Sequence, residues 1–321
     1  ALVPYFLATE IYKPQERWKE MAAMLDEAIK RNPEQKLEKP IIMDPDNITK
    51  DNILFTIEQG VEAYREEAWV MLFNQAIELR NANVDELVKL NLCLKMDSSR
   101  LETYNALVSY YAGKNDLQTA KNYVNQGLEE NESAALCEIK AKLLLTEFSN
   151  TTSRDKNLLI ESEEMYLKAI DLLAGDRDAI DKIKRQLIML YIDMDQNQRA
   201  INISTELLEI YYDDPDLYYN VGVLYQQLTM QLYNPAVDMY KDINDDVSGK
   251  KDIINQAYSN FLQSRIYAEQ SKIYFLDAND MEIEDTGSRE AAQEMRILMK
   301  SIDTFISSIK SIASENRINL D

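Results

Sequence analysis

Histidine is absent from the 321 residues, and cysteine occurs only twice, at Cys93 and Cys137. Without histidine the chain lacks the commonest general base and the commonest zinc ligand, so a Ser-His-Asp triad is excluded. Both cysteines lie within apolar helical patterns, where a free thiol behaves as a small hydrophobic side chain. We therefore predict two core residues rather than a disulfide.

Glycine and proline are scarce, with seven of each in the whole chain. Average usage is roughly 7% for glycine and 5% for proline, so tight turns and strand boundaries must be few. Hydrophobic residues make up 45% of the chain, enough to bury a large core. The composition predicts an all-α protein with essentially no strand.

Basic residues are outnumbered, with 35 Lys and Arg against 56 Asp and Glu, which gives a net charge of −21. Such a charge repels phosphate backbones and anionic membrane surfaces. No apolar run approaches the roughly 18 residues of a membrane-spanning helix. We therefore expect no nucleic-acid partner and no direct membrane span.

Nucleotide and metal motifs are missing as well. No G-x-G-x-x-G occurs, and "AGKND" and "SGKKD" lack the preceding glycine and the Ser or Thr of a phosphate-binding loop. Acidic stretches such as Asp44 to Asn52 lack the glycine and the glutamate that a calcium loop needs at its sixth and twelfth places. We expect no cofactor, no metal and no catalytic residue. A glycosidase-type carboxylate pair stays open as an alternative, although it needs a cleft that raises one pKa.

A helical pattern recurs along the chain. Its clearest copy has the spacing i, i+3, i+4, i+7, which places the four residues on one buried helix face. These residues are Tyr218, Val221, Gly222 and Tyr225. Similar sets begin at Lys184, which lies 34 residues earlier, and at Tyr104, which lies 34 residues after Val70. A period of this length predicts a helical solenoid.

The repeats resemble the tetratricopeptide repeat. "YYNVGVLY" matches the first helix of that unit, and "AIKRNP", "CLKMDS" and "KAIDLL" match the end of its second helix. The resemblance implies a right-handed α-solenoid of helix hairpins, in which Gly222 lets the two helices of one hairpin pack closely. The layout also resembles envelope-associated tetratricopeptide proteins of Bacteroidetes-type bacteria. This implies a periplasmic or cell-envelope location, with the cytoplasm as the alternative.

The pattern predicts three regions. They are an N-terminal helix with a proline-containing linker at 1–50, repeats at 51–276 and an acidic loop with a capping helix at 277–321. The repeats are expected at 67–100, 101–134, 135–180, 181–214 and 215–276, and a long helix is expected from about Asn52 to Asn81. Two insertions are expected between the helices of their hairpins, "EFSNTTSRDKN" and "YNPAVDMYKDINDDVSGKKD".

In tetratricopeptide proteins the first helix of each pair lines the concave face of the superhelix. The resemblance therefore implies a partner-binding surface made of Met71, Gln75, Asn105, Ser109, Lys182, Arg185, Met189, Tyr219, Val223 and Gln226. The Lys and Asn clamp that holds a peptide carboxylate in chaperone-binding relatives is not matched. Lys182 and Arg185 offer the one anion site on this surface, and the alternative is that they pair with acids such as Glu206 or Asp216.

These observations predict a non-catalytic scaffolding module that binds a protein or an extended peptide on its concave face. The main alternative is a structural subunit of a larger complex that docks through its insertions and the segment around Trp18. A carboxylate-based enzyme is the third interpretation.

Overall fold

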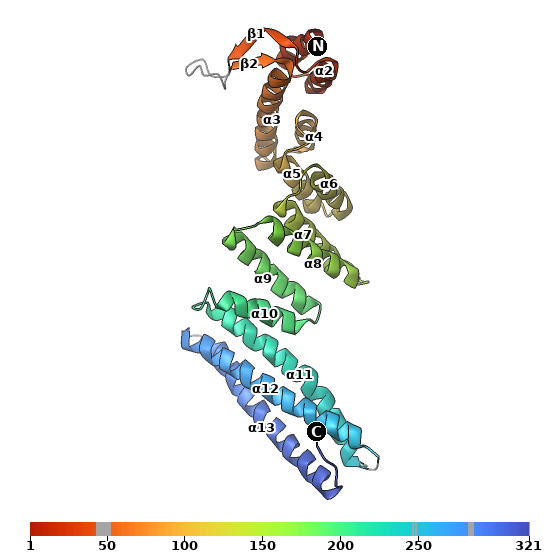
Figure 1. Ribbon diagram of the computed structural model, residues 1–321, viewed down its shortest axis with the longest axis vertical. Coiled ribbons are helices and arrows are strands. Elements are labelled where there is room, and N and C mark those ends of the chain that lie inside the picture. Colours follow the sequence, from red (N-terminus) through yellow and green to blue (C-terminus); the bar gives the residue numbers. More distant parts are fainter. Residues whose placement is uncertain (43–52, 246, 248, 282–285, 321) are drawn as a thin grey trace. The chain divides into compact units, whose positions relative to one another are not determined.

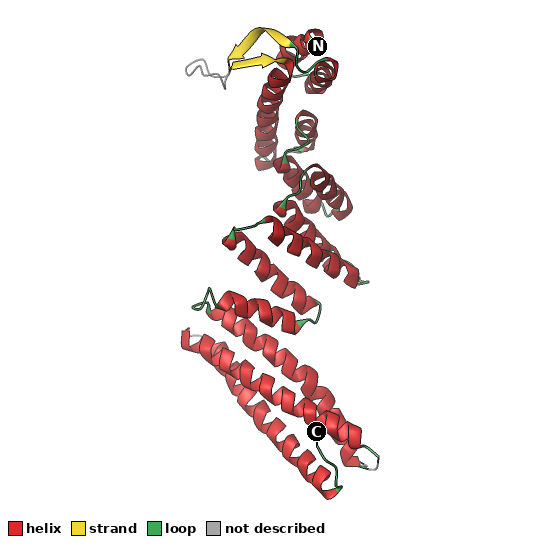
Figure 2. Cartoon of the chain, in the orientation of Figure 1, coloured by secondary structure: helices red, strands yellow, loops and turns green. Residues whose placement is uncertain are grey.

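The protein is described by a computed structural model that covers residues 1–42, 53–245, 247, 249–281 and 286–320. Helices dominate these residues, as the composition predicts (Figure 2). The chain forms two compact units, Ala1–Ala174 and Gly175–Asp321. This division falls inside the predicted repeat region at 51–276, so each unit is described by itself.

The first unit begins with short helical segments and a strand pair, which precede three helix hairpins (Figure 1). The segments are α1 (Leu2–Phe6), the π-helix η1 (Leu7–Tyr12), the 3-10 helix η2 (Lys13–Gln15), α2 (Trp18–Arg31), β1 (Lys36–Ile42) and β2 (Ile53–Thr56). The hairpins are α3 (Ile57–Asn81) with α4 (Leu87–Met96), α5 (Leu101–Gly113) with α6 (Leu117–Glu130), and α7 (Ala134–Asn150) with α8 (Lys156–Leu172).

One short strand pair accompanies the helices, and the fold is all-α as predicted. β1 and β2 run antiparallel, and Ile41 pairs with Leu54. Pro40 lies within β1, where it is tolerated because each strand of a two-stranded sheet has a free edge. The described residues of the predicted proline-containing linker, 33–42, are thus non-helical, but those of β1 form a strand.

The long helix α3 begins at Ile57, not near Asn52 as predicted. Thr56 caps it, because its hydroxyl accepts a hydrogen bond from the Gln59 amide at 3.3 Å. The Gln59 side chain accepts one from the Thr56 amide at 3.2 Å in return. This reciprocal pair is a capping box, which fixes the start of a helix where a strand ends.

The predicted insertion "EFSNTTSRDKN" is mostly helix. α7 and α8 have 17 residues each, and the connection between Asn150 and Lys156 is short. Asp155 caps α8, since its carboxylate accepts a hydrogen bond from the Asn157 amide at 3.0 Å. The extra residues therefore lengthen the hairpin instead of forming a loop between its helices.

Successive hairpins of the first unit are joined by a buried hydrogen bond. The indole Nε1 of Trp69 on α3 donates to Thr103 Oγ1 on α5 at 2.9 Å, and the two residues are 34 positions apart. Trp69 is 7% exposed and Thr103 is fully buried. The 34-residue period thus brings equivalent positions of α3 and α5, the first helices of two successive hairpins, into contact.

The N-terminal helix α2 packs on the first hairpin, as predicted. Met21, Leu25 and Ala28 are fully buried in one core cluster with residues of α3 and α4. Cys93 and Cys137 are buried free thiols, which confirms that they are core residues. Burial raises the pKa of the Cys93 thiol to about 12.

The described residues of the second unit form five helices (Figure 1). They are α9 (Arg177–Asp193), α10 (Asn197–Leu208), α11 (Pro215–Asp245), α12 (Lys251–Met281) and α13 (Thr286–Glu315). α11 and α12 form a hairpin of 31 residues on each side. α13 packs against both of them through the buried side chains of Ile302, Ile306 and Ile309.

Residues 233–245 of the second predicted insertion are also helix, because α11 continues through Pro235 to Asp245. An interior proline removes a hydrogen bond and normally kinks a helix. Packing opposes this cost here, since Tyr233 contacts Phe261 and Phe305 edge-on at 6.0 and 6.1 Å between ring centroids. The acidic loop is shorter than predicted, because α12 extends to Met281; residues 282–285 lie outside the described part of the chain.

Gly222 lies where α11 meets α12, and the close approach predicted for it is confirmed. A Cβ atom at this position would lie 2.7 Å from Phe275 Cδ1 on α12. The Ser271 hydroxyl, also on α12, donates to the Gly222 carbonyl oxygen at 2.7 Å. The contact between α11 and α12 therefore requires a residue without a Cβ atom at position 222.

Candidate functional site

The predicted partner-binding residues fall into two sets, one in each unit. Met71, Gln75, Asn105 and Ser109 lie on α3 and α5, and Lys182, Arg185, Met189, Tyr219, Val223 and Gln226 lie on α9 and α11. Because the two units are separate bodies, these sets are two surfaces rather than one site.

The surface on the first unit is polar and partly buried. The amide oxygens of Gln75 and Asn105 are buried without a hydrogen-bond partner among the described residues. Met71 packs against the N-terminal core, and the exposed Ser109 hydroxyl donates to the Asn105 carbonyl at 2.8 Å. Of these four residues, Ser109 also lines a hollow of about 520 Å³ at the turn between α3 and α4.

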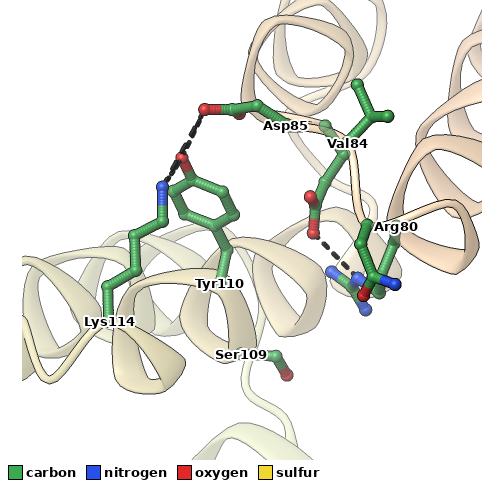
Figure 3. A pocket seen from close by; sticks show the side chains of 8 residues that line it. Arg80, Val84, Asp85, Ser109, Tyr110 and Lys114 are labelled. Carbon is green, nitrogen blue, oxygen red and sulfur yellow. Dashed lines mark hydrogen bonds and ion pairs between the residues drawn. The ribbon is translucent and has the colours of Figure 1, made fainter.

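Half of the eight residues that line this hollow are charged, and the sequence analysis selected none of these four (Figure 3). Arg80 Nε contacts Glu86 Oε1 at 2.8 Å, and Glu86 is only 7% exposed. The Tyr110 hydroxyl donates to Asp85 Oδ2 at 2.9 Å and accepts a hydrogen bond from Lys114 Nζ. These groups form ion pairs and hydrogen bonds with one another. The cluster therefore links α5 to the turn between α3 and α4.

Two pKa shifts agree with a structural role for this cluster. The Leu87 amide, and then the Tyr110 hydroxyl, lower the pKa of Asp85 by hydrogen bonding to its carboxylate. The hydrogen bond to Tyr110 raises the pKa of Lys114. Both groups are therefore held in their charged forms near neutral pH, and neither is tuned for proton transfer.

On the second unit, Arg185, one of the two cations of the predicted anion site, already pairs with an acidic side chain. Arg185 contacts Asp214 Oδ2 at 2.8 Å, and its guanidinium lies over the Tyr211 ring at 5.2 Å. The alternative of pairing with a neighbouring acid thus applies to Arg185, although the acid is Asp214 rather than Glu206 or Asp216. Glu206 instead pairs with Lys184 at 3.0 Å, while Lys182 is exposed.

Exposed apolar side chains lie on the same helix faces. Met189 on α9 is 61% exposed. Tyr219 on α11 is 37% exposed, and its ring packs against Phe275 at 5.3 Å between centroids. Lys182, Met189 and Ile192 are spaced to lie along one side of α9.

Val223 and Gln226 line a groove of about 680 Å³ that runs along α11. Its other lining residues are Ile192, Asp195, Asn197, Gln227, Met230, Gln231 and Asn234. Six of the nine come from one side of α11, between Val223 and Asn234. The sequence analysis selected only Val223 and Gln226 from these six residues.

Asn197 is the least exposed polar residue of the groove. It is the first residue of α10 and is 3% exposed. Its Oδ1 atom is buried and has no hydrogen-bond partner among the described residues. An unsatisfied buried acceptor costs about 1–3 kcal/mol of folding free energy, so burying this oxygen without a partner lowers the stability of the fold by an amount of that order.

A second hollow of about 330 Å³ lies between α10, α11 and α12. It is lined in part by Glu209, Tyr218 and Asp277. Burial, and then the nearby Asp280, raise the pKa of Asp277. The carboxylate-based enzyme alternative requires a carboxyl group with a raised pKa, and Asp277 is such a group among the described residues.

The described residues lack two features that would indicate other functions. None of their helices combines the length and the apolar character needed to cross a membrane. No group of three or more His, Cys, Asp or Glu side chains among them is arranged to hold a metal ion. The acidic stretch from Asp44 to Asn52 lies outside the described part of the chain.

No family model matches the sequence, and no curated protein matches it. Solved structures similar to this chain include two tetratricopeptide repeat proteins from Parabacteroides merdae and Bacteroides fragilis. The first has 13% identity and a TM-score of 0.40 over 91% of this chain and 99% of its own, and the second has 12% and 0.39 over 72% and 98%. The MamA protein has 13% identity and a TM-score of 0.46 over 68% of this chain and 94% of its own. At such identities, the function has to be argued from the residues of this chain.

Proposed function

We propose that the chain is a non-catalytic protein-interaction module whose second unit holds an extended segment of a partner protein along α9 and α11. The groove beside Val223 and Gln226 carries this proposal. Both residues belong to the binding surface that the resemblance to the tetratricopeptide repeat implies. Met189 and Tyr219 add exposed apolar area on the same two helices. Exposed apolar side chains next to a polar groove are typical of surfaces that bind proteins.

The alternative of a structural subunit is less well supported. Trp18 lies in the segment that this alternative expected to dock on a neighbour, and it is only 6% exposed and packs within its own unit. Most of the residues expected as insertions lie in helices, and α11 and α12 bury their added length against α13. What remains for this alternative is the exposed apolar side of α1 and η1, formed by Val3, Leu7 and Ile11. The periplasmic or envelope location and its cytoplasmic alternative stay predictions.

A matched pair of variants tests the proposal. Met189→Glu places a charge on the proposed surface, and Ile266→Glu makes the same change on α12, where the side chain is similarly exposed at 54% against 61%. Each chain is used to capture partners from extracts of its source cells, and captured proteins are quantified by mass spectrometry. We expect Met189→Glu to lose captured partners that Ile266→Glu retains. Equal capture by both variants would move binding away from α9 and α11.

The cation site is tested separately. Lys182→Glu alone is the clean variant, because Arg185→Glu would bring a carboxylate against Asp214 and lower the thermal midpoint. We expect Lys182→Glu to weaken capture while leaving the midpoint unchanged. A control with the same charge change is Lys241→Glu, since that side chain is 69% exposed on the far part of α11. Unchanged capture by Lys182→Glu would exclude an acidic group of the partner at this position.

A further inference from the structure

We propose that the hollow between α10, α11 and α12 binds a small aliphatic diamine, a molecule with an ammonium group at each end of a hydrocarbon chain. This inference goes beyond the proposed function, because the hollow shares no lining residue with the groove beside Val223 and Gln226. It is carried by two carboxylates, two tyrosine rings and two helix ends that meet there.

The hollow lies within the second unit, where the ends of α10 and α12 meet the start of α11 (Figure 1). Its volume of about 330 Å³ falls within the range of about 300–1,000 Å³ that is typical of small-molecule sites. Glu209 directly follows α10, and Asp277 lies in the last part of α12. Half of the eight lining residues share one face of α12, with the spacing i, i+3, i+4, i+7. They are Gln270, Ile273, Tyr274 and Asp277.

Both charged residues that line the hollow are acidic. They are Glu209 and Asp277, and no lysine or arginine is among the eight described residues of the lining. Asp277 is half-buried, and its burial, and then the nearby Asp280, raise its pKa. A neighbouring cation would lower that pKa, and the described residues place none beside this carboxylate. A cation from outside the chain would supply the missing charge.

The two helix ends add to the negative potential. The carboxyl-terminal end of an α-helix carries about half a negative charge, which favours a cation nearby. Neither α10 nor α12 has a basic residue in its last turn. The start of α11 has the opposite partial charge, but Asp214 compensates it by accepting a hydrogen bond from the Leu217 amide at 3.0 Å. A bound cation would therefore relieve an unfavourable arrangement of negative charges.

Tyrosine rings and apolar side chains suit the hydrocarbon part of such a ligand. The rings of Tyr218 and Tyr274 both line the hollow, and their centroids lie 6.0 Å apart. Aromatic rings also attract ammonium groups through the negative charge of their faces. Leu208 and Ile273 add apolar surface that a hydrocarbon chain can cover. The hollow thus combines anionic groups for the ends of the ligand with apolar contacts for its middle.

A single ammonium group and a metal ion both match the hollow less well. A lysine side chain of a partner protein would neutralise one carboxylate and leave the other, whereas a diamine neutralises both. Divalent ions such as Mg²⁺ and Ca²⁺ take about six or more oxygen ligands. The described residues contain no group of three or more His, Cys, Asp or Glu side chains that could hold such an ion. These comparisons favour an organic dication.

Titration with butane-1,4-diamine tests the inference directly. Binding to the full chain is followed by isothermal calorimetry and by NMR at about 0.15 M salt, where the field of the remaining net charge is screened beyond about 8 Å. We expect saturable binding, with chemical-shift changes confined to the ends of α10 and α12 and the start of α11. Butylamine and the methylamide of acetyl-lysine, which each carry one ammonium group, should bind at least about tenfold more weakly. Butane-1,4-diol should not bind, and Mg²⁺ should not compete.

Matched variants complete the test. Asp277→Asn should weaken diamine binding about tenfold or more, and Glu209→Gln about two- to fivefold, because Glu209 is exposed. Asp252→Asn removes the same charge from the opposite end of α12 and should leave binding unchanged. The thermal midpoint of Asp277→Asn should not fall, since this variant removes a half-buried charge that has no counter-ion.

Three results would each overturn the inference. They are the absence of saturable diamine binding, full binding by Asp277→Asn, and equal binding of butylamine and the diamine. The proposed function would stand in each case, because partner capture is tested at Met189, which lies outside this hollow.

Discussion

The contact at Gly222 gives a prediction whose size can be worked out from the structure. A Cβ added there lies 2.7 and 2.8 Å from Cδ1 and Cε1 of Phe275, well inside ordinary contact. Phe275 is fully buried, so its ring has little room to move away. Overpacking of this kind costs about 1–3 kcal/mol. Replacing a mid-helix glycine with alanine returns about 1 kcal/mol of helix propensity.

We therefore expect Gly222→Ala to lower the free energy of unfolding by about 0–2 kcal/mol, and Gly222→Leu to lower it by more. The control is Gly113→Ala, because Gly113 ends α5 and a Cβ there meets nothing within 4 Å. That variant should be neutral or stabilising. The free energies are measured by urea unfolding followed by circular dichroism.

A double-mutant cycle identifies the cause of the loss. Phe275→Leu removes the ring that the new Cβ meets, although it also leaves a cavity in the core. If the clash is the reason, the double variant Gly222→Ala with Phe275→Leu is more stable than the two single losses predict, by about 1 kcal/mol. Additive losses, or a Gly222→Ala variant that gains as much stability as Gly113→Ala, would refute the close-approach explanation.

Two further predictions concern buried polar groups. Burial raises the pKa of Tyr166 to about 12, and its hydroxyl has no partner among the described residues. Since an unfolded tyrosine titrates near pH 10, the stability that depends on its neutral form is complete below about pH 10 and is lost as the pH rises to about 12. Tyr166→Phe should be as stable as the parent near neutral pH and lose less stability over that range; parallel losses in urea midpoint would contradict this. Thr103→Val leaves the Trp69 indole N–H unpaired and should cost about 1–3 kcal/mol, so an unchanged urea midpoint would show that this hydrogen bond contributes nothing.

The repeating part of the fold follows from local sequence. The 34-residue period predicted hairpins, and α5 with α6 and α9 with α10 are such hairpins. Gly222 was predicted to lie at a helix contact because a glycine inside a helix has a cost that needs a reason. These predictions succeeded because they depend on residues that are near one another in the chain.

The failures depend on contacts between distant segments. β1 contains Pro40 and charged residues, so its pairing with β2 is not evident from its own composition. Pro235 is a second example, because proline on its own favours the end of a helix. Here the packing of Tyr233 against α12 and α13 outweighs that preference, and α11 continues.

The candidate site was predicted in part for the same reason. Val223 and Gln226 follow from helical spacing, and both line the groove. Asn197 could not be found in this way, because its importance depends on an oxygen that tertiary neighbours bury. Arg185 was identified as a cation, but its partner Asp214 follows the next helix and is brought near by folding.

Site-specific photocrosslinking tests the central claim, which is that partners bind along α9 and α11. A benzophenone amino acid replaces Met189 in one chain and Ile266 in another, and each chain is irradiated in its source cells. Both side chains are exposed to a similar extent, so their intrinsic chance of a random adduct is comparable. The account predicts a discrete protein adduct at Met189 and none at Ile266. An adduct at Ile266 or the absence of one at Met189 would contradict it.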